Sequence, residues 1–198
     1  MADPYPQLPS RRGGENAPSL VLVGGPPASG KTTLAHKIAH AIPCPAICKD
    51  EIKEGLVHAE GGIKPAWGGP ISTRTLQAFY KTVQDLLTAG VTVVAEASFM
   101  RDRSEQDLLP LTTIARPRML HCTISPELAH ERFVRRAAED ARTRVSHPDA
   151  EFIKALEEGA LSFEDFGPLE LSIPILTVDT TSGYDPSMES MLEFINGT

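Results

Sequence analysis

The chain has 198 residues, of which 41% are hydrophobic and 23% are charged, and its formal net charge is −7. These proportions are typical of a globular protein and argue against a disordered or fibrous chain. The acidic balance gives no overall attraction to phosphate polymers or anionic membranes, so we do not expect nucleic acid as a partner. No apolar run approaches the ~18 residues of a membrane span, and no signal-peptide core is present, so we expect a cytoplasmic protein without a membrane partner.

The first 18 residues are rich in proline, with Pro4, Pro6, Pro9 and Pro18, and poor in apolar side chains. This composition predicts a disordered leader over residues 1–18 and a folded domain over residues 19–198.

Five short apolar runs then alternate with stretches of helical length. We predict strands at 20–24, 46–50, 91–98, 118–125 and 173–179. The runs are nearly continuous in Val, Leu and Ile, which indicates strands covered on both faces, and helical crossovers between them imply parallel pairing. The expected fold is therefore α/β, a three-layer sandwich around a five-stranded parallel sheet. The Gly/Pro-rich stretch 59–72 interrupts this rhythm and is expected to be a long loop or a small flap.

A glycine-rich turn follows the first strand and precedes a helical segment. Gly25, Gly30, Lys31 and Thr32 fit the phosphate-loop pattern G-x-x-x-x-G-K-[ST] in the context that it requires. Backbone amides of such a turn and the helix N-terminus bind phosphate, while the lysine reaches the outer phosphates and the threonine holds magnesium. We therefore expect ATP, with GTP left open, and Mg²⁺ as cofactors. The expected nucleotide-binding residues are Gly25, Pro26, Pro27, Ala28, Ser29, Gly30, Lys31, Thr32 and Thr33.

Asp50 ends the second expected strand, at the sheet edge where α/β proteins place ligands. A carboxylate there can accept the proton of an attacking hydroxyl, so Asp50 is the candidate general base. The alternative is that Asp50 caps the helix that follows. Lys53, one turn later, is expected to steady the acceptor, or else to be a solvated helix lysine.

Glu96 lies near the end of the third expected strand, where a charge emerges from an apolar run and is costly without a partner. We expect it to meet magnesium or the acceptor, the alternative being a carboxylate held by loop amides. Thr32 and Glu96 are thus the candidate metal residues. Arg101 is a candidate for binding an acceptor anion, although pairing with Asp102 or Glu105 is the simpler and favoured reading.

The segment 125–149 carries the main cluster of arginines. Arg132 and Arg136 are four residues apart on one helical face and are expected to close over the triphosphate as a lid, over about 132–150, and to neutralise charge during transfer. The alternative is a helix with salt bridges along its surface.

The stretch 59–72 also contains the only tryptophan of the chain, Trp67. Its ring is expected either to stack on a substrate ring or to pin the loop to the core, and the sequence does not favour one over the other.

Three cysteines, Cys44, Cys48 and Cys122, lack the paired spacing of a zinc site. We expect buried, reduced thiols and no disulfide.

Four stretches, "GGPPASGKTT", "ICKDEIKEGL", "VTVVAEASFMR" and "ERFVRRA", carry a resemblance. They are similar to P-loop kinases grouped around chloramphenicol phosphotransferase, polynucleotide 5′-kinase and zeta-toxin-type enzymes, a group often described as AAA-type ATP-binding proteins. The resemblance spans about residues 19–196 and implies a P-loop NTPase, nucleoside-kinase-like fold with an arginine-bearing lid. It also implies that Asp50 is the general base and that the loop containing Gly183 borders the adenine. Glu96 stands where many members have Asp, and Lys53 stands where polynucleotide kinases have Arg.

Together these residues predict an enzyme, a P-loop kinase that moves the γ-phosphate of Mg-ATP to a hydroxyl of a small molecule such as an antibiotic, a nucleoside or a sugar derivative. Two alternatives stay open: a nucleotide-dependent regulatory ATPase switch, and a polynucleotide 5′-hydroxyl kinase. The sequence leaves the acceptor and the oligomeric state open.

Overall fold

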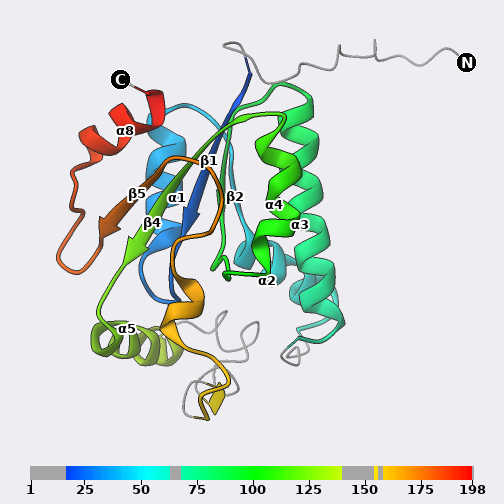
Figure 1. The fold of residues 1–198 in the computed structure, drawn as a ribbon. Helices are drawn as coiled ribbons and strands as arrows, with labels where there is room; N and C mark the ends of the chain where they lie inside the picture. Colours follow the sequence, from blue (N-terminus) through cyan, green and yellow to red (C-terminus); the bar gives the residue numbers. More distant parts are fainter. Residues whose placement is uncertain (1–16, 63–67, 140–153, 156–157, 198) are drawn as a thin grey trace, which may run out of the picture.

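The computed structural model describes residues 17–62, 68–139, 154–155 and 158–197, with the side chains of 133, 134 and 136–139 left out. Its centre is a five-stranded sheet in the order β2-β3-β1-β4-β5, in which every neighbouring pair is parallel (Figure 1). The strands are β1 (Ser19–Gly24), β2 (Ala46–Cys48), β3 (Val93–Glu96), β4 (Arg116–Thr123) and β5 (Ile175–Asp179). The predicted five-stranded parallel sheet is confirmed.

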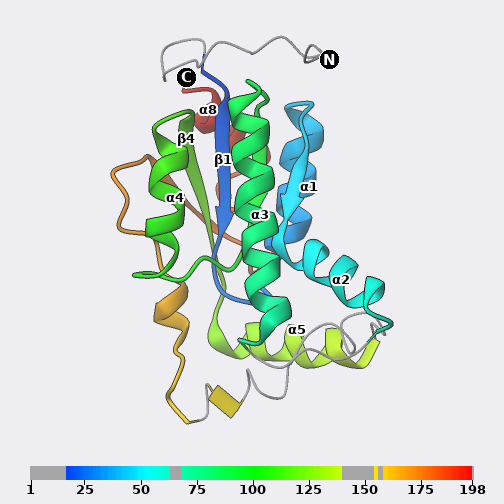
Figure 2. The ribbon, with the colours of Figure 1, turned by 90° about the vertical axis from the view of Figure 1, so that its right-hand side faces the viewer.

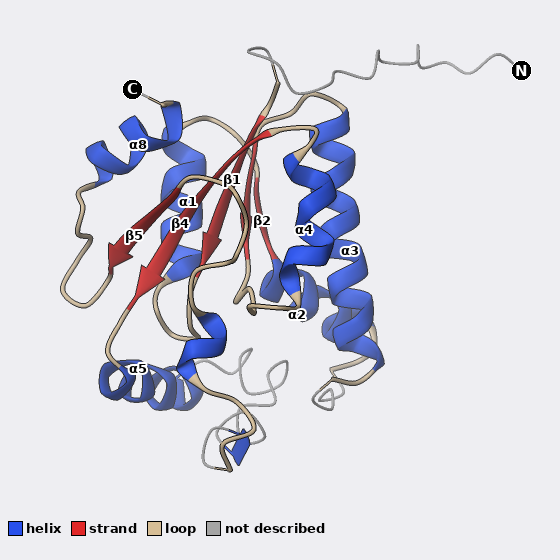
Figure 3. Ribbon diagram, in the orientation of Figure 1, coloured by secondary structure: helices blue, strands red, loops and turns tan. Residues whose placement is uncertain are grey.

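Helices cover both faces of this sheet, which makes three layers (Figures 2 and 3). The described helices are α1 (Lys31–Ala41), α2 (Lys49–Ala59), α3 (Pro70–Thr88), α4 (Ser104–Thr112), α5 (Pro126–Glu139) and α8 (Met188–Asn196), with a short 3-10 helix, η1 (Phe163–Phe166). None of the helices described here is both long enough and apolar enough to cross a bilayer.

Side chains of the central strand alternate between two apolar cores. Leu20 and Leu22 belong to a core with α3 and α4, whereas Val21 and Val23 belong to a core with α1 and α8. Each of these β1 side chains is almost completely buried. Because successive side chains of a strand point to opposite faces, a strand buried on both faces must be apolar at every position. This is why the run in the sequence shows no polar alternation.

Several boundaries differ from the sequence expectations. The second strand ends at Cys48, because Lys49 already begins α2. The third strand covers only Val93–Glu96. The expected loop 59–72 is shorter, because Pro70 starts α3, where its fixed φ angle suits the first helical turn.

Part of the expected leader belongs to the fold. The carbonyl of Pro18 accepts a hydrogen bond from the backbone N–H of Arg116 at 2.9 Å, and Ala17 is buried. Residues 1–16 lie outside the described residues.

All five strands end at one edge of the sheet, because they are parallel (Figure 1). The glycine-rich turn follows β1 there, the first turn of α2 follows β2, and Glu96 is the last residue of β3. From β1 the chain passes to the edge strand β2, returns to β3 beside β1, and then crosses to β4 and β5 on the other side. The order of the strands therefore reverses next to β1, and open α/β sheets bind ligands at such a topological switch point.

Candidate active site

The phosphate loop has a backbone shape that two glycines make possible. Gly25 has a φ of 129°, and a Cβ built on it would lie 2.2 Å from the carbonyl oxygen of Cys122. Gly30, with a φ of 79°, is the N-cap residue of α1 and has open space around it. Ala28 also has a positive φ, 62°, which costs an L-residue conformational energy. Gly25 is therefore required by its close packing against Cys122 as well as by its φ, whereas Gly30 is required by its positive φ alone.

This loop leads into a helix N-terminus that is open to an anion. The N-cap of α1 makes no side-chain hydrogen bond, and the first turn of the helix holds no acidic residue. The first-turn amides of a helix have no acceptor within the helix, and the helix dipole favours negative charge at this end. The Lys31 ammonium folds back over the loop and donates a hydrogen bond to the carbonyl of Pro26 at 2.8 Å. Amides without a cap, beside a lysine, suit a phosphate group.

Glu96 is the buried carboxylate of the site. It is 2% exposed at the end of β3, and its Oε2 accepts a hydrogen bond from Thr32 Oγ1 at 3.2 Å. Burial raises the pKa of Glu96, the Asp50 carboxylate adds to this rise, and the Lys31 ammonium opposes it. A hydroxyl oxygen and a carboxylate oxygen held together are the ligand types that Mg²⁺ prefers, so these two residues suit such an ion.

Asp50 lies in the first turn of α2 rather than at the end of a strand, which corrects the sequence expectation. The N-cap position belongs to Cys48, so Asp50 is not the capping residue. Its Oδ1 accepts a hydrogen bond from Lys49 Nζ at 2.8 Å, and its side chain is 40% exposed. Burial lowers the pKa of Lys49, but the Asp50 and Glu96 carboxylates together outweigh it and raise that pKa above its ordinary value. An acid in this position is also favoured by the helix dipole.

Four charges form one cluster at this edge, Lys31, Lys49, Asp50 and Glu96, which we call the charge cluster. Burial lowers the pKa of Lys31, and the Glu96 and Asp50 carboxylates oppose this shift. The Lys31 and Lys49 ammonium groups in turn act to lower the pKa of Glu96. The structure thus brings together the predicted loop lysine, the predicted base and the predicted metal residue, which lie at the ends of three different strands or just after them.

Two residues of the site region were missed in the sequence. Lys49 was not singled out, although it precedes Asp50 directly. His121 sits in an apolar run of β4, opposite Gly24 in the register, and is buried. Its pKa is lowered by burial, and further by the positive charges of Lys31 and Arg101. A titratable side chain within the apolar run "RMLHCT" was the signal that could have found it.

Two other residues predicted to bind the acceptor, Lys53 and Arg101, differ in burial: Lys53 is buried and Arg101 is partly buried. Lys53 in α2 is 8% exposed, so the reading as a solvated lysine is wrong. Arg101 packs its guanidinium against Gly167, and its Nε is buried without a hydrogen-bond partner. Within the described residues no ion pair joins Arg101 to Asp102 or Glu105.

Arg132 links α5 to the loop after β5 through hydrogen bonds. Its Nη2 donates hydrogen bonds to the carbonyls of Thr180 at 3.1 Å and Thr181 at 2.8 Å. The Asp179 carboxylate accepts a further bond from the Thr181 N–H at 2.7 Å, and Gly183 follows with a φ of 127°. Figures 1 and 2 show α5 beyond the carboxyl ends of the strands.

Three sequence expectations fall outside the described parts of the chain. They are the side chain of Arg136, the lid beyond residue 139 as far as residue 150, and Trp67.

A family model described as an AAA domain matches residues 20–157. A solved structure of a kinase candidate from Chloroflexus aurantiacus J-10-fl is 28% identical, with a TM-score of 0.76 over 91% of this chain and 98% of that chain. A gluconokinase from Sinorhizobium meliloti 1021 is 19% identical, with a TM-score of 0.52 over 90% of this chain and 89% of that chain. Chaetomium thermophilum Kti12 in complex with ADP-AlF3 is 14% identical, with a TM-score of 0.55 over 91% and 96%. The last two likenesses show the fold alone. No protein of curated function matches the sequence.

Proposed function

Because the chain belongs to the family described as an AAA domain and has a P-loop kinase-like fold, we propose that it moves the γ-phosphoryl group of Mg-ATP to a hydroxyl group of a small molecule. The observation that carries this proposal is the position of Asp50. Its carboxylate is partly open to solvent, yet close enough to Lys31 and Glu96 to change the pKa of both. The nucleotide end and the acceptor end of a transfer site therefore meet in the charge cluster.

Residues of the phosphate loop supply the nucleotide end. The amides of the first turn of α1 bind phosphate oxygens, and Lys31 exchanges the Pro26 carbonyl for the outer phosphates when ATP enters. This exchange gives up one bond from the ammonium to a neutral carbonyl and replaces it with bonds to phosphate oxygens, in which both partners are charged.

Thr32 and Glu96 supply the oxygens for the metal site. When bound there, Mg²⁺ would neutralise charge on the phosphate tail. The buried position of Glu96 suits this task, because a carboxylate without nearby water gains most from a cation.

Asp50 supplies the acceptor end. Its carboxylate takes the proton of the acceptor hydroxyl while the hydroxyl oxygen forms a bond to the γ-phosphorus and the bond to the ADP oxygen breaks. Lys49 positions this carboxylate through their 2.8 Å hydrogen bond. The proton is retained on Asp50 until the product leaves.

We infer the class of the acceptor from the charge of the chain and of the site. The chain carries a net charge of −7, and the two carboxylates of the charge cluster offset its two lysines, so no excess of positive charge favours a polyanion. A small hydroxylated molecule fits this site better than a polynucleotide end. We also propose a cytoplasmic location, where ATP is available.

The test is a screen of sugars, nucleosides and hydroxylated antibiotics with Mg-ATP, read by a mass gain of one phosphate. We expect one class to gain phosphate, and we expect Asp50→Asn to slow transfer about 10²- to 10⁴-fold with Mg-ATP binding retained in calorimetry. Asp107→Asn, which removes another first-turn acid from an exposed position on α4, is the control and keeps both properties.

Three results would overturn the proposal. If Asp50→Asn transferred phosphate at the wild-type rate, Asp50 would not be the general base. Phosphorylation of a 5′-hydroxyl oligonucleotide alone would favour the polynucleotide kinase. Slow ATP hydrolysis without any phosphorylated acceptor, together with ATP-dependent capture of a protein, would favour the regulatory switch.

A further inference from the structure

Three potential metal ligands meet on the α1 face of the sheet, beside the edge strand β2, where α1 passes the start of α2. His36 comes from α1, Cys48 is the last residue of β2, and Glu51 lies in the first turn of α2. The imidazole Nε2 lies 2.7 Å from Glu51 Oε1 and 3.7 Å from Cys48 Sγ. The three ligand atoms all lie within 4.8 Å of one another. His36 is thus beside two residues that lie 12 and 15 positions from it in sequence.

We propose that His36, Cys48 and Glu51 form a binding site for a thiophilic divalent cation, for which Zn²⁺ is the representative ion. Imidazole, thiolate and carboxylate are the ligand types that Zn²⁺ uses, and three protein ligands with a fourth, open position is a common arrangement. This site adjoins the proposed magnesium site, because Cys48 pairs with Glu96 in the sheet and its thiol lies near that carboxylate. Its ligands are different, however, and the proposal does not depend on the proposed function.

The spacing of the ligand atoms suits a tetrahedral ion after a small movement. Metal distances of about 2.0–2.3 Å place neighbouring ligand atoms roughly 3.3–3.8 Å apart. The distance between Cys48 Sγ and His36 Nε2, 3.7 Å, already lies in that range. The His36 to Glu51 contact of 2.7 Å is a hydrogen bond and must open by about half an ångström or more to admit an ion. Both side chains can make this movement, because they are 51% and 49% exposed.

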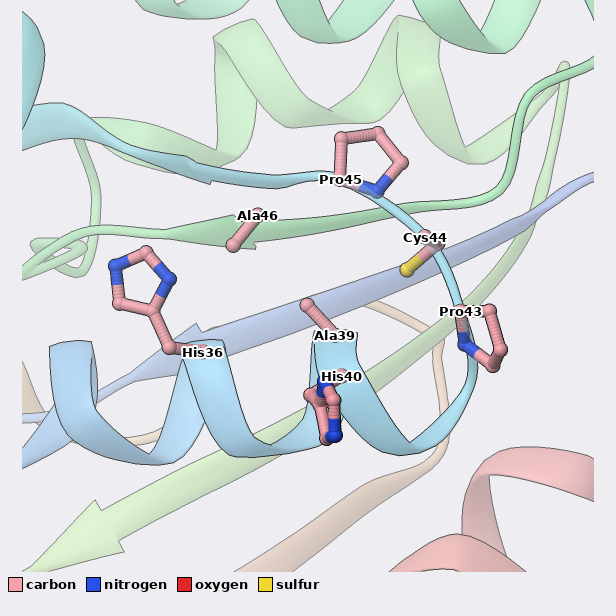
Figure 4. Close-up of a pocket in the computed structure, with 7 residues that line it drawn as sticks. All are labelled: His36, Ala39, His40, Pro43, Cys44, Pro45 and Ala46. Atoms are coloured by element: carbon pink, nitrogen blue, oxygen red, sulfur yellow. The ribbon is translucent and has the colours of Figure 1, made fainter.

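Solvent reaches the site from a groove between α1 and the segment that leads into β2. The groove is lined by His36, Ala39, His40, Pro43, Cys44, Pro45 and Ala46 (Figure 4). His36 and Cys44 lie at opposite ends of this groove in the figure, so the thiol of Cys44 is not the one beside the imidazole. A hydrated ion can therefore approach His36 and Glu51 first and keep one water as its fourth ligand.

The sulfur ligand determines which ions the site prefers. Thiolate ligands favour Zn²⁺ and similar ions, whereas Mg²⁺ prefers an all-oxygen site such as Thr32 and Glu96. Binding releases the Cys48 proton to solvent, as at other thiolate sites. The alternative is that these three residues bind no metal ion. His36 and Glu51 would then form only a surface ion pair beside the buried thiol of Cys48.

The experiment uses the untagged protein and Co²⁺ as the probe. A thiolate bound to Co²⁺ gives a charge-transfer band in the near ultraviolet, and oxygen ligands at the magnesium site do not. We expect this band in the wild type, its displacement by Zn²⁺, and its survival in excess Mg²⁺. Cys48→Ser should abolish the band, and His36→Ala or Glu51→Gln should weaken Co²⁺ binding at least about tenfold.

Two matched controls share the same groove. Cys44→Ser and His40→Ala remove a thiol and an imidazole of the same kinds and should leave the band unchanged. If Cys48→Ser does not fold, His36→Ala decides the matter, because half of that side chain is exposed. No band in the wild type, or a band that persists in Cys48→Ser or is as strong in His36→Ala, would overturn the proposal.

Discussion

The hydroxyl of Thr32 donates a hydrogen bond to the buried carboxylate of Glu96 at 3.2 Å. It joins the first turn of α1 to the end of β3, two elements 64 residues apart in sequence. This contact places an acid of the sheet edge beside the phosphate loop. It also ties the stability of the protein to the charge on one carboxylate.

The first prediction concerns pH. The pKa of Glu96 is raised by burial, so the folded protein holds this proton more tightly than the unfolded chain. The stability from this group is present below the ordinary pKa of 4.5 and is lost as the pH rises through the raised pKa. Glu96→Gln imitates the neutral form and should remove this loss. Chemical denaturation from about pH 4 to about pH 7 should show a decline of the wild type relative to the variant. Parallel curves would show that Glu96 does not titrate in this range.

Lys31 should govern nucleotide affinity. Lys31→Met removes the ammonium that lies over the loop. A hydrogen bond to a charged group is worth about 1.5–3 kcal/mol, so we expect roughly 10- to 150-fold weaker Mg-ATP binding in calorimetry. Lys81→Met, which breaks an exposed ion pair with Asp85, is the control for the loss of one positive charge. Equal affinities of the wild type and Lys31→Met would mean that ATP binds elsewhere.

The two loop glycines should differ in their tolerance of alanine. At Gly30 only the positive φ is strained, so Gly30→Ala should cost about 1–2 kcal/mol of unfolding free energy. At Gly25 the new Cβ would also lie 2.2 Å from the carbonyl oxygen of Cys122, which is main chain and cannot turn aside. Gly25→Ala should therefore destabilise the protein more than Gly30→Ala. Urea denaturation measures both, and the reverse order would contradict the described loop.

Arg132 should control the loop after β5. Arg132→Ala removes the bonds to the carbonyls of Thr180 and Thr181, so the amides of this loop should exchange hydrogen faster. Arg135→Ala, on the same helix and with only a 4.0 Å contact to Glu131, should not change the exchange. If Arg132→Ala lowers phosphoryl transfer but leaves exchange unchanged, the arginine acts on the phosphates and not on the loop.

The phosphate loop and the sheet could be predicted from the sequence because each is encoded locally. The loop is one contiguous stretch, Gly25 to Thr32, and the pattern carries its own flanking strand and helix. The strands appear as apolar runs because both faces of each are buried. A boundary such as that between Cys48 and Asp50 was harder, because the apolar pattern does not show where the helix takes over.

The roles of single side chains depended on contacts that spacing does not show. Lys49 had no separate signal before its bond to Asp50 was seen, and His121 became part of the site region only because β4 lies beside β1. The cysteine spacing likewise excluded a paired zinc motif, yet Cys48 meets His36 and Glu51 from two other elements.

The sequence by itself determined a parallel α/β sheet and a loop for phosphate, because hydrophobic periodicity and glycine conformation act between near neighbours in the chain. Only the tertiary structure decided which charges share the edge of that sheet. Parallel strands bring the ends of distant segments together, and their burial, not their order in sequence, sets the pKa of Glu96 and Lys31 and the partners of Asp50, Arg132 and Cys48.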